Sequence, residues 1–243
     1  MRLTSYWPRG AVIELNLCLK SARFISCINR FAALVVCDSR EIMAHVSNSG
    51  RLSELLHPSN PMLLAPALAD TGRRTTYDLA LVEIDGVLVS VDARLHNALL
   101  HEAIEAGRLP PFVGYDRLTR EIVFGESRLD IMLSGDRGRC YLEAKSVTLV
   151  RDGVGLFPDT PTRRGRKYLM SLMSASKLGH RAAVVFVIQR CDAHAFSSNE
   201  DADPLFCQAL REAVRSGVEV YVYRCRVSRR QVEVVARVPA CLS

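Results

Sequence analysis

The sequence predicts two domains: a small β domain, followed by a larger α/β domain with a mixed sheet flanked by helices. Three observations support this prediction. Short β-prone runs and turn clusters fill residues 1–84, which contain no long helical pattern. Helical and strand-like segments then alternate towards the C-terminus, which is typical of an α/β sheet. A chain of 243 residues is also long enough to bury two cores.

The composition is that of a globular protein, with 49% hydrophobic and 24% charged residues. The apolar run at residues 11–19 is broken by Glu14 and Asn16, so we expect neither a signal peptide nor a membrane span. The eight cysteines contain no CxxC pair or zinc spacing, which indicates free thiols in a reducing cytoplasm. A net charge of +6 favours a polyanionic partner such as nucleic acid.

The β domain is predicted to be a small barrel. Strands are expected at residues 11–19, 26–37, 41–46 and 76–83. Short helical turns are expected at residues 52–56 and 62–68. Four or five short strands in this length favour closure, because a closed barrel leaves no exposed strand edge.

Small barrels bind single strands by combining a basic groove with stacking aromatic side chains. The candidate nucleic-acid contacts are Arg23, Asn48, Arg51, Arg74 and Tyr77. Asn48, together with Ser49 and Gly50, could also present backbone N–H groups to a phosphate. Phe24 and Phe31 fit either stacking positions or the barrel core, and we favour the core.

We place the domain boundary at the turn of residues 85–86, which gives domains of residues 1–84 and 85–243. The second domain then starts with a helix at residues 95–106, whose leucines recur at helical spacing and whose end is marked by Gly107. Further helices are predicted at residues 163–178 and 204–216, and strands at residues 182–189, 218–225 and 231–238.

The chemistry of this domain is expected on a β-hairpin at residues 128–145, which alternates polar and apolar residues on both sides of a glycine-containing turn. A symmetrical fold about residues 136–137 sets Asp130 opposite Glu143, with Lys145 on the same face. Two carboxylates this close call for a cation between them, and Mg²⁺ or Mn²⁺ suits oxygen ligands. The alternative is a solvated hairpin whose charged side chains form cross-strand salt bridges.

An Asp followed after a gap by Glu-x-Lys is the arrangement of the PD-(D/E)xK nuclease core. The run YLEAKSVTLVRDGVGLFPDTPTRRGRKYL resembles the signature block of the sugar fermentation stimulation protein A family. Further segments that resemble the family are HVSNSGRLSELLHP, GRRTTYDLALVE, LHNALLHEAIEAGRLP, GESRLDIML and VVFVIQR. The resemblance extends over roughly residues 20–225. It implies an OB-like β-barrel followed by a restriction-endonuclease-like domain.

The resemblance also implies roles for the hairpin residues. Asp130 and Glu143 would hold the metal ion, with the backbone carbonyl of Ala144 as a further ligand. Lys145 would orient the attacking water or help to deprotonate it, and would offset phosphate charge.

Positions outside the hairpin are further candidates. The resemblance places Glu102 of the first helix at the metal site, where a solvated helix glutamate is the alternative. Gln189, at the end of a buried strand, is the candidate for a polar residue near the site. Arg163, Arg166 and Lys167 stand at a helix N-terminus against the macrodipole preference, which is unfavourable unless an anion lies nearby. We interpret them as phosphate contacts, with a solvated basic patch as the alternative.

The leading functional hypothesis is therefore a cytoplasmic, metal-dependent nuclease that binds DNA without reading its sequence. No helix-turn-helix or similar base-reading motif occurs. The alternative is a non-catalytic DNA-binding regulator of sugar (maltose) metabolism on a nuclease-like fold. A sugar sensor ranks last, because no cluster of carboxylates and aromatics stands out in the β domain. The sequence leaves open the choice of strand type, of DNA or RNA, and of monomer or homodimer.

Overall fold

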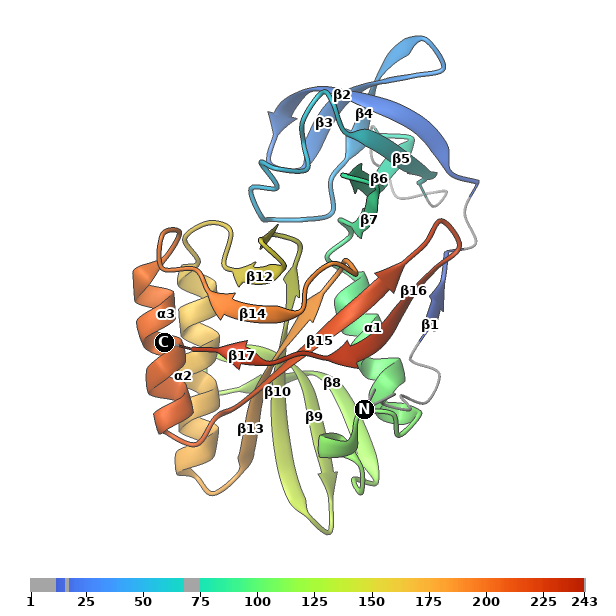
Figure 1. Ribbon diagram of the computed structural model, residues 1–243. Helices are drawn as coiled ribbons and strands as arrows, with labels where there is room; N and C mark the ends of the chain where they lie inside the picture. Colours follow the sequence, from blue (N-terminus) through green and yellow to red (C-terminus); the bar gives the residue numbers. More distant parts are fainter. Residues whose placement is uncertain (1–11, 16–17, 68–74, 243) are drawn as a thin grey trace, which may run out of the picture.

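The computed structural model describes residues 12–15, 18–67 and 75–242 of the chain. Within these ranges the chain forms a β-barrel domain stacked on a mixed sheet flanked by helices, which confirms the predicted fold class (Figure 1). Among the described helices, none is long and apolar enough to cross a membrane.

Five strands make the barrel: β2 (Lys20–Asn29), β3 (Ala32–Cys37), β4 (Arg40–His45), β5 (Pro61–Pro66) and β6 (Tyr77–Ile84). They follow the order β4-β3-β2-β5-β6, and a parallel pairing of β4 with β6 closes the ring. Val35, Leu64 and Leu79 are fully buried in its interior. Closure satisfies the backbone of all five strands without another domain.

Two predictions for this domain are wrong in detail. Residues 26–37, predicted as one strand, contain the end of β2, a turn and all of β3. Residues 62–68, predicted as a helical turn, include most of β5, where Met62 and Leu64 are fully buried. Short apolar runs do not distinguish a buried strand from a helical turn, because neither shows a clear periodicity.

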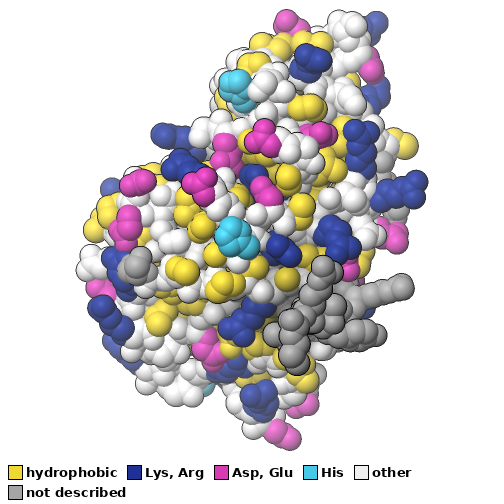
Figure 2. Space-filling model, viewed as in Figure 1, with side chains coloured by type: hydrophobic (Ala, Val, Ile, Leu, Met, Phe, Trp, Pro, Cys, Tyr) yellow, Lys and Arg dark blue, Asp and Glu magenta, His cyan; other side chains and the backbone are white. Residues whose placement is uncertain are grey.

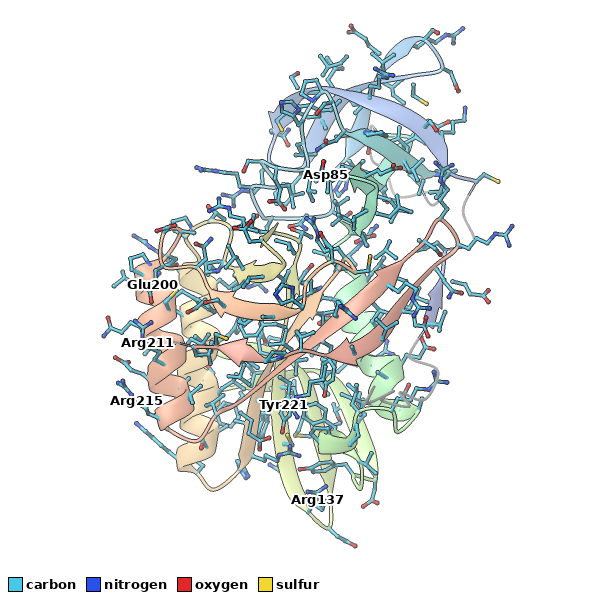
Figure 3. All side chains as sticks on the ribbon, viewed as in Figure 1. Asp85, Arg137, Glu200, Arg211, Arg215 and Tyr221 are labelled. Carbon is cyan, nitrogen blue, oxygen red and sulfur yellow. The ribbon has the colours of Figure 1, made fainter. Side chains whose placement is uncertain are left out.

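The barrel domain ends later in the chain than the predicted boundary at residues 85–86. Asp85 and Gly86 form the turn between β6 and β7 (Val87–Ser90), and β7 pairs with β6 in the barrel sheet. Figure 3 accordingly shows Asp85 within the upper domain. In the other direction, β1 (Val12–Glu14) pairs with a strand of the lower sheet. The barrel domain therefore extends past residue 84, and β1 belongs to the sheet of the second domain.

The main sheet of the second domain has the order β1-β16-β15-β13-β10-β9-β8. Its further strands are β8 (Arg117–Phe124), β9 (Ser127–Gly135), β10 (Gly138–Val147), β13 (Arg181–Ile188), β15 (Glu219–Val227) and β16 (Gln231–Arg237). A small second sheet contains β11 (Val150–Arg151), β12 (Val154–Phe157), β14 (Ala195–Ser198) and β17 (Ala240–Cys241). The central strand β13 pairs in parallel with β10 and β15, as its continuous apolar sequence predicted.

Three α-helices cover the two faces of this sheet, and a 3₁₀ turn, η1 (Pro110–Phe112), follows the first. α1 (Leu95–Glu105) packs on one face through Leu99 and Leu100, while α2 (Arg163–Lys177) and α3 (Pro204–Arg215) lie side by side on the other. The Thr162 hydroxyl accepts the Gly165 N–H and so caps α2. Asp203 caps α3 in the same way.

Polar contacts connect the two domains. The Ser90 N–H of the barrel donates to the Gln189 carbonyl at 3.0 Å. Arg190, which is 5% exposed, lies 3.3 Å through Nη1 from Glu54 Oε1 and is held in place by Asp192. Burial raises the pKa of Glu54 to about 7, although Arg190 opposes the shift.

We predict that Glu54 makes the protein less stable as the pH rises from 4.5 to about 7. A raised native pKa means that the folded state holds the proton more tightly, so its stabilising effect is complete below the unfolded pKa and disappears as the pH passes about 7. Denaturant unfolding across this range should show a flatter pH dependence for Glu54→Gln than for the parent protein. The control is Glu41→Gln on the exposed side of β4, which should keep the parent slope. Equal slopes for Glu54→Gln and the parent protein would contradict the prediction.

Candidate active site

The predicted hairpin forms in the predicted register. β9 and β10 pair antiparallel around the turn of residues 136–137, and their ladder ends one pair before Asp130 and Glu143. At that point the Ala144 N–H donates to Asp130 Oδ2 at 2.8 Å. A carboxylate oxygen therefore accepts this hydrogen bond in place of a backbone carbonyl of β9. Figure 3 shows Arg137 at the distal tip of the hairpin. The register puts the two carboxylates beyond the other end of the ladder.

Asp130, Glu143 and Lys145 line a pocket of about 300 Å³. Its wall includes residues of both domains: His96 and Asn97 of α1, Arg164 and Tyr168 of α2, Asp159 of the segment before α2, and Asn48, Ser49 and Gly50 of the barrel. The hairpin residues singled out by the sequence are thus brought together where the domains meet. The barrel is part of the pocket and not only an attached module.

Glu143 is 3% exposed, and its Oε1 forms an ion pair with Lys145 Nζ. The same ammonium lies 4.6 Å from the centroid of the Tyr168 ring. Burial raises the pKa of Glu143 to about 7, an effect that Lys145 opposes and Asp130 reinforces. The second oxygen, Oε2, is buried and has no hydrogen-bond partner among the described residues. A buried oxygen in this state is unfavourable unless a cation or a donor reaches it.

Asp130 is fixed by two donors from different elements. Asn97 Nδ2 donates to Oδ1 at 3.0 Å, and the Ala144 N–H holds Oδ2. The Asn97 Oδ1 atom is also buried and lacks a partner within the described part of the chain. Two buried oxygens without partners, on Asn97 and Glu143, therefore belong to side chains that line one pocket beside Asp130.

This donor set fits a hard divalent cation, because carboxylate, amide and carbonyl oxygens are the ligands that Mg²⁺, Mn²⁺ and Ca²⁺ prefer. The described residues contain no group of three or more His, Cys, Asp or Glu side chains that could hold a metal. Asp130 and Glu143 would consequently need help from the Asn97 amide and the Ala144 carbonyl. Burial lowers the pKa of His96 in the same wall to about 4, so its ring is neutral at pH 7.

Two of the predicted catalytic residues, Glu102 and Gln189, do not lie on the pocket wall. Glu102 is exposed, because α1 turns its Leu99 face to the core and brings its first turn, with Asn97, to the pocket instead. Gln189 is fully buried behind the wall. Its Nε2 donates to the Ser146 hydroxyl at 2.9 Å, so Gln189 contacts the pocket through Ser146.

The structure separates the cations at the start of α2. Arg166 Nη1 lies 2.9 Å from both carboxylate oxygens of Asp203, which is 3% exposed. Lys167 Nζ lies 3.5 Å from Glu126 Oε2, and Arg163 is exposed outside the pocket wall. Of the three predicted phosphate contacts, Arg166 is therefore occupied in joining α2 to α3.

Arg164, which the sequence did not single out as a contact, is the arginine that lines the pocket. Its Nε donates to the Tyr168 hydroxyl at 2.5 Å. This hydrogen bond is the main cause of the raised pKa of Arg164, and the charges of Glu143 and Asp130 contribute. The sequence predicted an anion near this helix N-terminus, and the Glu143 and Asp130 carboxylates provide part of that negative charge.

The predicted nucleic-acid contacts of the barrel also lie in different places. Arg23 is exposed beside a different hollow, and Tyr77 is half-buried against the barrel core. Arg74 lies outside the described residues. Phe24 packs against the core as predicted, whereas Phe31 is 50% exposed, because it stands in the turn between β2 and β3. Phe31 is therefore a surface residue.

Asn48 is the barrel candidate that reaches the pocket. Its Nδ2 donates to the Val91 carbonyl at 3.0 Å, and its Oδ1 accepts the Gly50 N–H at 2.8 Å. Arg51 has an exposed side chain, but its backbone N–H donates to Asp159 Oδ2 at 2.7 Å. The loop thus directs N–H groups at an oxygen anion, although from Arg51 instead of the predicted residues 48–50.

Comparison with known proteins agrees with this architecture. A family profile described as the SfsA N-terminal OB domain matches residues 25–91. A second profile, the sugar fermentation stimulation protein RE domain, matches residues 94–231. The two matched ranges meet just beyond β7, which supports the boundary seen in the sheets.

Proteins similar to this chain over most of their length are also known. A sugar fermentation stimulation protein homolog of Moorella thermoacetica is 44% identical over 228 residues, which cover 93% of this chain and 98% of that protein. A homolog of Desulforamulus reducens is 42% identical over 224 residues, or 92% and 93% of the two chains. The structure of Pyrococcus furiosus SfsA in complex with Ca²⁺ is 28% identical and has a TM-score of 0.87, covering 94% of this chain and 98% of that one.

We predict that Arg166 stabilises the fold. Arg166→Ala leaves the buried Asp203 carboxylate without its cation, and the free energy of unfolding should fall by about 3 kcal/mol. Arg163→Ala is the matched control, because the same change at an exposed position of the same turn should stay within about 0.5 kcal/mol. Urea denaturation of both variants measures the difference. Equal losses would show that the Arg166–Asp203 pair contributes nothing specific.

Proposed function

Because the chain belongs to the sugar fermentation stimulation protein A family, we propose that it binds nucleic acid and hydrolyses phosphodiester bonds with a divalent metal ion. The observation that carries this proposal is the pair of buried oxygens, Glu143 Oε2 and Asn97 Oδ1, that lack described partners beside Asp130. The related structure from Pyrococcus furiosus is a complex with Ca²⁺, which supports a divalent cation in the family. Mg²⁺ or Mn²⁺ is the proposed working ion.

In this mechanism Asp130 and Glu143 would hold the ion, with oxygens of Asn97 and Ala144 as further ligands. The bound ion supplies Lewis acidity, which polarises a phosphate and lowers the pKa of coordinated water. Lys145 now balances the charge of Glu143, and beside a substrate its ammonium would orient the attacking water and offset phosphate charge.

Two residues of α2 support this chemistry. The Tyr168 ring holds the Lys145 ammonium by a cation–π contact and so limits its movement. The Tyr168 hydroxyl anchors Arg164, whose guanidinium would bind a phosphate oxygen at the pocket rim. Positioning of this kind accounts for a large share of catalysis in phosphate chemistry, where charge develops on several oxygens.

Nucleic acid is the proposed substrate, since the chain is basic and the pocket combines a metal-type donor set with cations. On the face shown in Figure 2, basic and acidic side chains are interspersed, so that face offers no continuous basic surface. Phosphate contacts are thus expected mainly at the pocket between the domains. Such contacts fix the register of a strand without reading its bases.

We predict metal-dependent cleavage of labelled DNA that is lost when either hairpin residue is changed. Glu143→Ala removes a ligand of the ion, and Lys145→Ala removes the ammonium next to the water. Each should lower the rate at least about a hundredfold. The assay compares single- and double-stranded DNA in Mg²⁺, Mn²⁺ and EDTA. Glu102→Ala is the control, because this exposed glutamate does not line the pocket and should keep the parent rate.

The same assay tests the alternative function. Salt-sensitive binding of DNA without cleavage in any metal would leave a non-catalytic DNA-binding regulator on a nuclease-like fold. The closed ion pair between Glu143 and Lys145 is the observation that this alternative would use, because it satisfies one carboxylate oxygen without a metal.

We also predict that Asn97→Ala weakens metal binding. Its Nδ2 orients Asp130 and its Oδ1 is a candidate ligand, so calorimetric titration with Mn²⁺ should show an affinity about tenfold or more lower. Asn97→Asp keeps an oxygen at the second position and should retain more of the affinity than the alanine variant. Unchanged affinity in Asn97→Ala would remove this residue from the site.

A further inference from the structure

A loop of the barrel, residues 48–52, presents consecutive backbone N–H groups to oxygen acceptors. The N–H groups of Arg51 and Leu52 both donate to Asp159 Oδ2, at 2.7 and 3.3 Å. The Gly50 N–H donates to Asn48 Oδ1 at 2.8 Å. Leu52 has a φ of 49°, in the left-handed region that a leucine rarely adopts. Successive N–H groups in such a turn form a concavity that binds anions.

The anion in this concavity belongs to the protein itself. Asp159 lies in the segment between β12 and α2 of the second domain, and its carboxylate reaches across to the barrel loop. No lysine or arginine of the described ranges lies within ion-pair distance of it. Backbone N–H groups are thus the hydrogen-bond donors that the structure gives Asp159 Oδ2.

This position is next to the candidate active site. Asp159 and Gly50 both line the pocket that contains Glu143 and Lys145. Gly50 also lines a neighbouring hollow on the barrel side, together with Arg30. An anion held by the loop therefore sits between the metal site and the barrel surface. A strand bound at the metal site would place a further phosphate of its backbone in this region.

We propose that residues 48–52 are a phosphate-binding subsite for the nucleic-acid strand, and that Asp159 occupies it until a strand phosphate displaces the carboxylate. The ligand identity rests on the proposed function. A phosphodiester and a carboxylate each carry one negative charge and accept hydrogen bonds from the same donors. The subsite makes the barrel loop a direct contact of the strand that enters the pocket, whereas the side chains of Arg23 and Tyr77 do not line this pocket.

Gly50 provides a specific test, because a Cβ at this residue would lie 2.5 Å from Asp159 Oδ2. A methyl group there would fill the space that the anion uses. The Asp159→Ala variant leaves the subsite open to a strand phosphate. Its affinity for a labelled single-stranded oligodeoxynucleotide should therefore rise about fivefold to tenfold. In the double variant Asp159→Ala with Gly50→Ala, this gain should disappear. Fluorescence anisotropy in EDTA measures binding without cleavage.

Two further variants distinguish phosphate binding at the subsite from the general loss of a negative charge and from poor folding. Asp201→Ala removes the same charge at an exposed position near the loop and should change affinity less than about twofold. Asp159→Asn keeps an oxygen acceptor without the charge, so it should raise the affinity less than Asp159→Ala does. It also keeps the proposal testable if the alanine variant folds poorly. Inorganic phosphate, added as a competitor, distinguishes a free phosphate from the strand. The proposal requires that millimolar phosphate leaves most of the oligonucleotide bound.

The outcomes that would overturn the proposal are distinct. An equal gain with and without Gly50→Ala would mean that charge repulsion alone is relieved. Weaker binding in both Asp159→Ala and Asp159→Asn would make the carboxylate a structural link between the domains. Full displacement of the oligonucleotide by millimolar phosphate would assign the subsite to a free anion. All these measurements use EDTA, so a lack of nuclease activity would leave them unaffected.

Discussion

Burial of the Glu143 carboxylate is the constraint on which the site depends. An ionised side chain that is 3% exposed loses its hydration, and the structure compensates for this with a cation placed on the same strand face, Lys145. The ladder of β9 and β10 ends at this point, which lets Asp130 use its carboxylate for the Ala144 N–H. Helix α2 covers the pair with Tyr168, so the charges stay in a shielded environment. The hairpin, the helix and the pocket wall therefore together hold two carboxylates and an ammonium in one place.

The barrel completes the same arrangement from the other side. The strands of the hairpin carry their functional residues towards the domain junction, and the barrel loop of residues 48–50 forms part of the wall there. Contacts such as Arg190 with Glu54 and Ser90 with Gln189 fix the two domains relative to each other. A shift between the domains would alter the pocket itself, because residues of both line it. The position of the barrel is thus as important for the site as its binding surface.

Local patterns predicted the parts of this structure that depend on neighbouring residues in the sequence. Alternation and a central turn predicted the register of Asp130 and Glu143. Contacts between distant segments were not predictable in this way. The rotation of α1 decides that Asn97 faces the pocket and Glu102 faces solvent, and it depends on which leucines the core accepts. The pairing of Arg166 with Asp203 likewise requires that α2 and α3 lie side by side, which charge patterns along one helix do not show.

The two internal ions of the site, Lys145 and Asp159, share a physical property that explains how the site could exchange ligands. Lys145 gives Glu143 a positive partner where a metal ion is proposed, and Asp159 gives the barrel loop a negative partner where a phosphate is proposed. An internal ion in each place satisfies groups that would otherwise be buried without compensation. At the barrel loop, binding of a strand phosphate would replace the Asp159 carboxylate by another anion of the same charge, so the buried charge there changes little. On this argument the two internal ions keep the pocket ordered for binding. The strand phosphate has to compete with the Asp159 carboxylate for its place, whereas the metal ion would use the Glu143 oxygen that Lys145 does not contact.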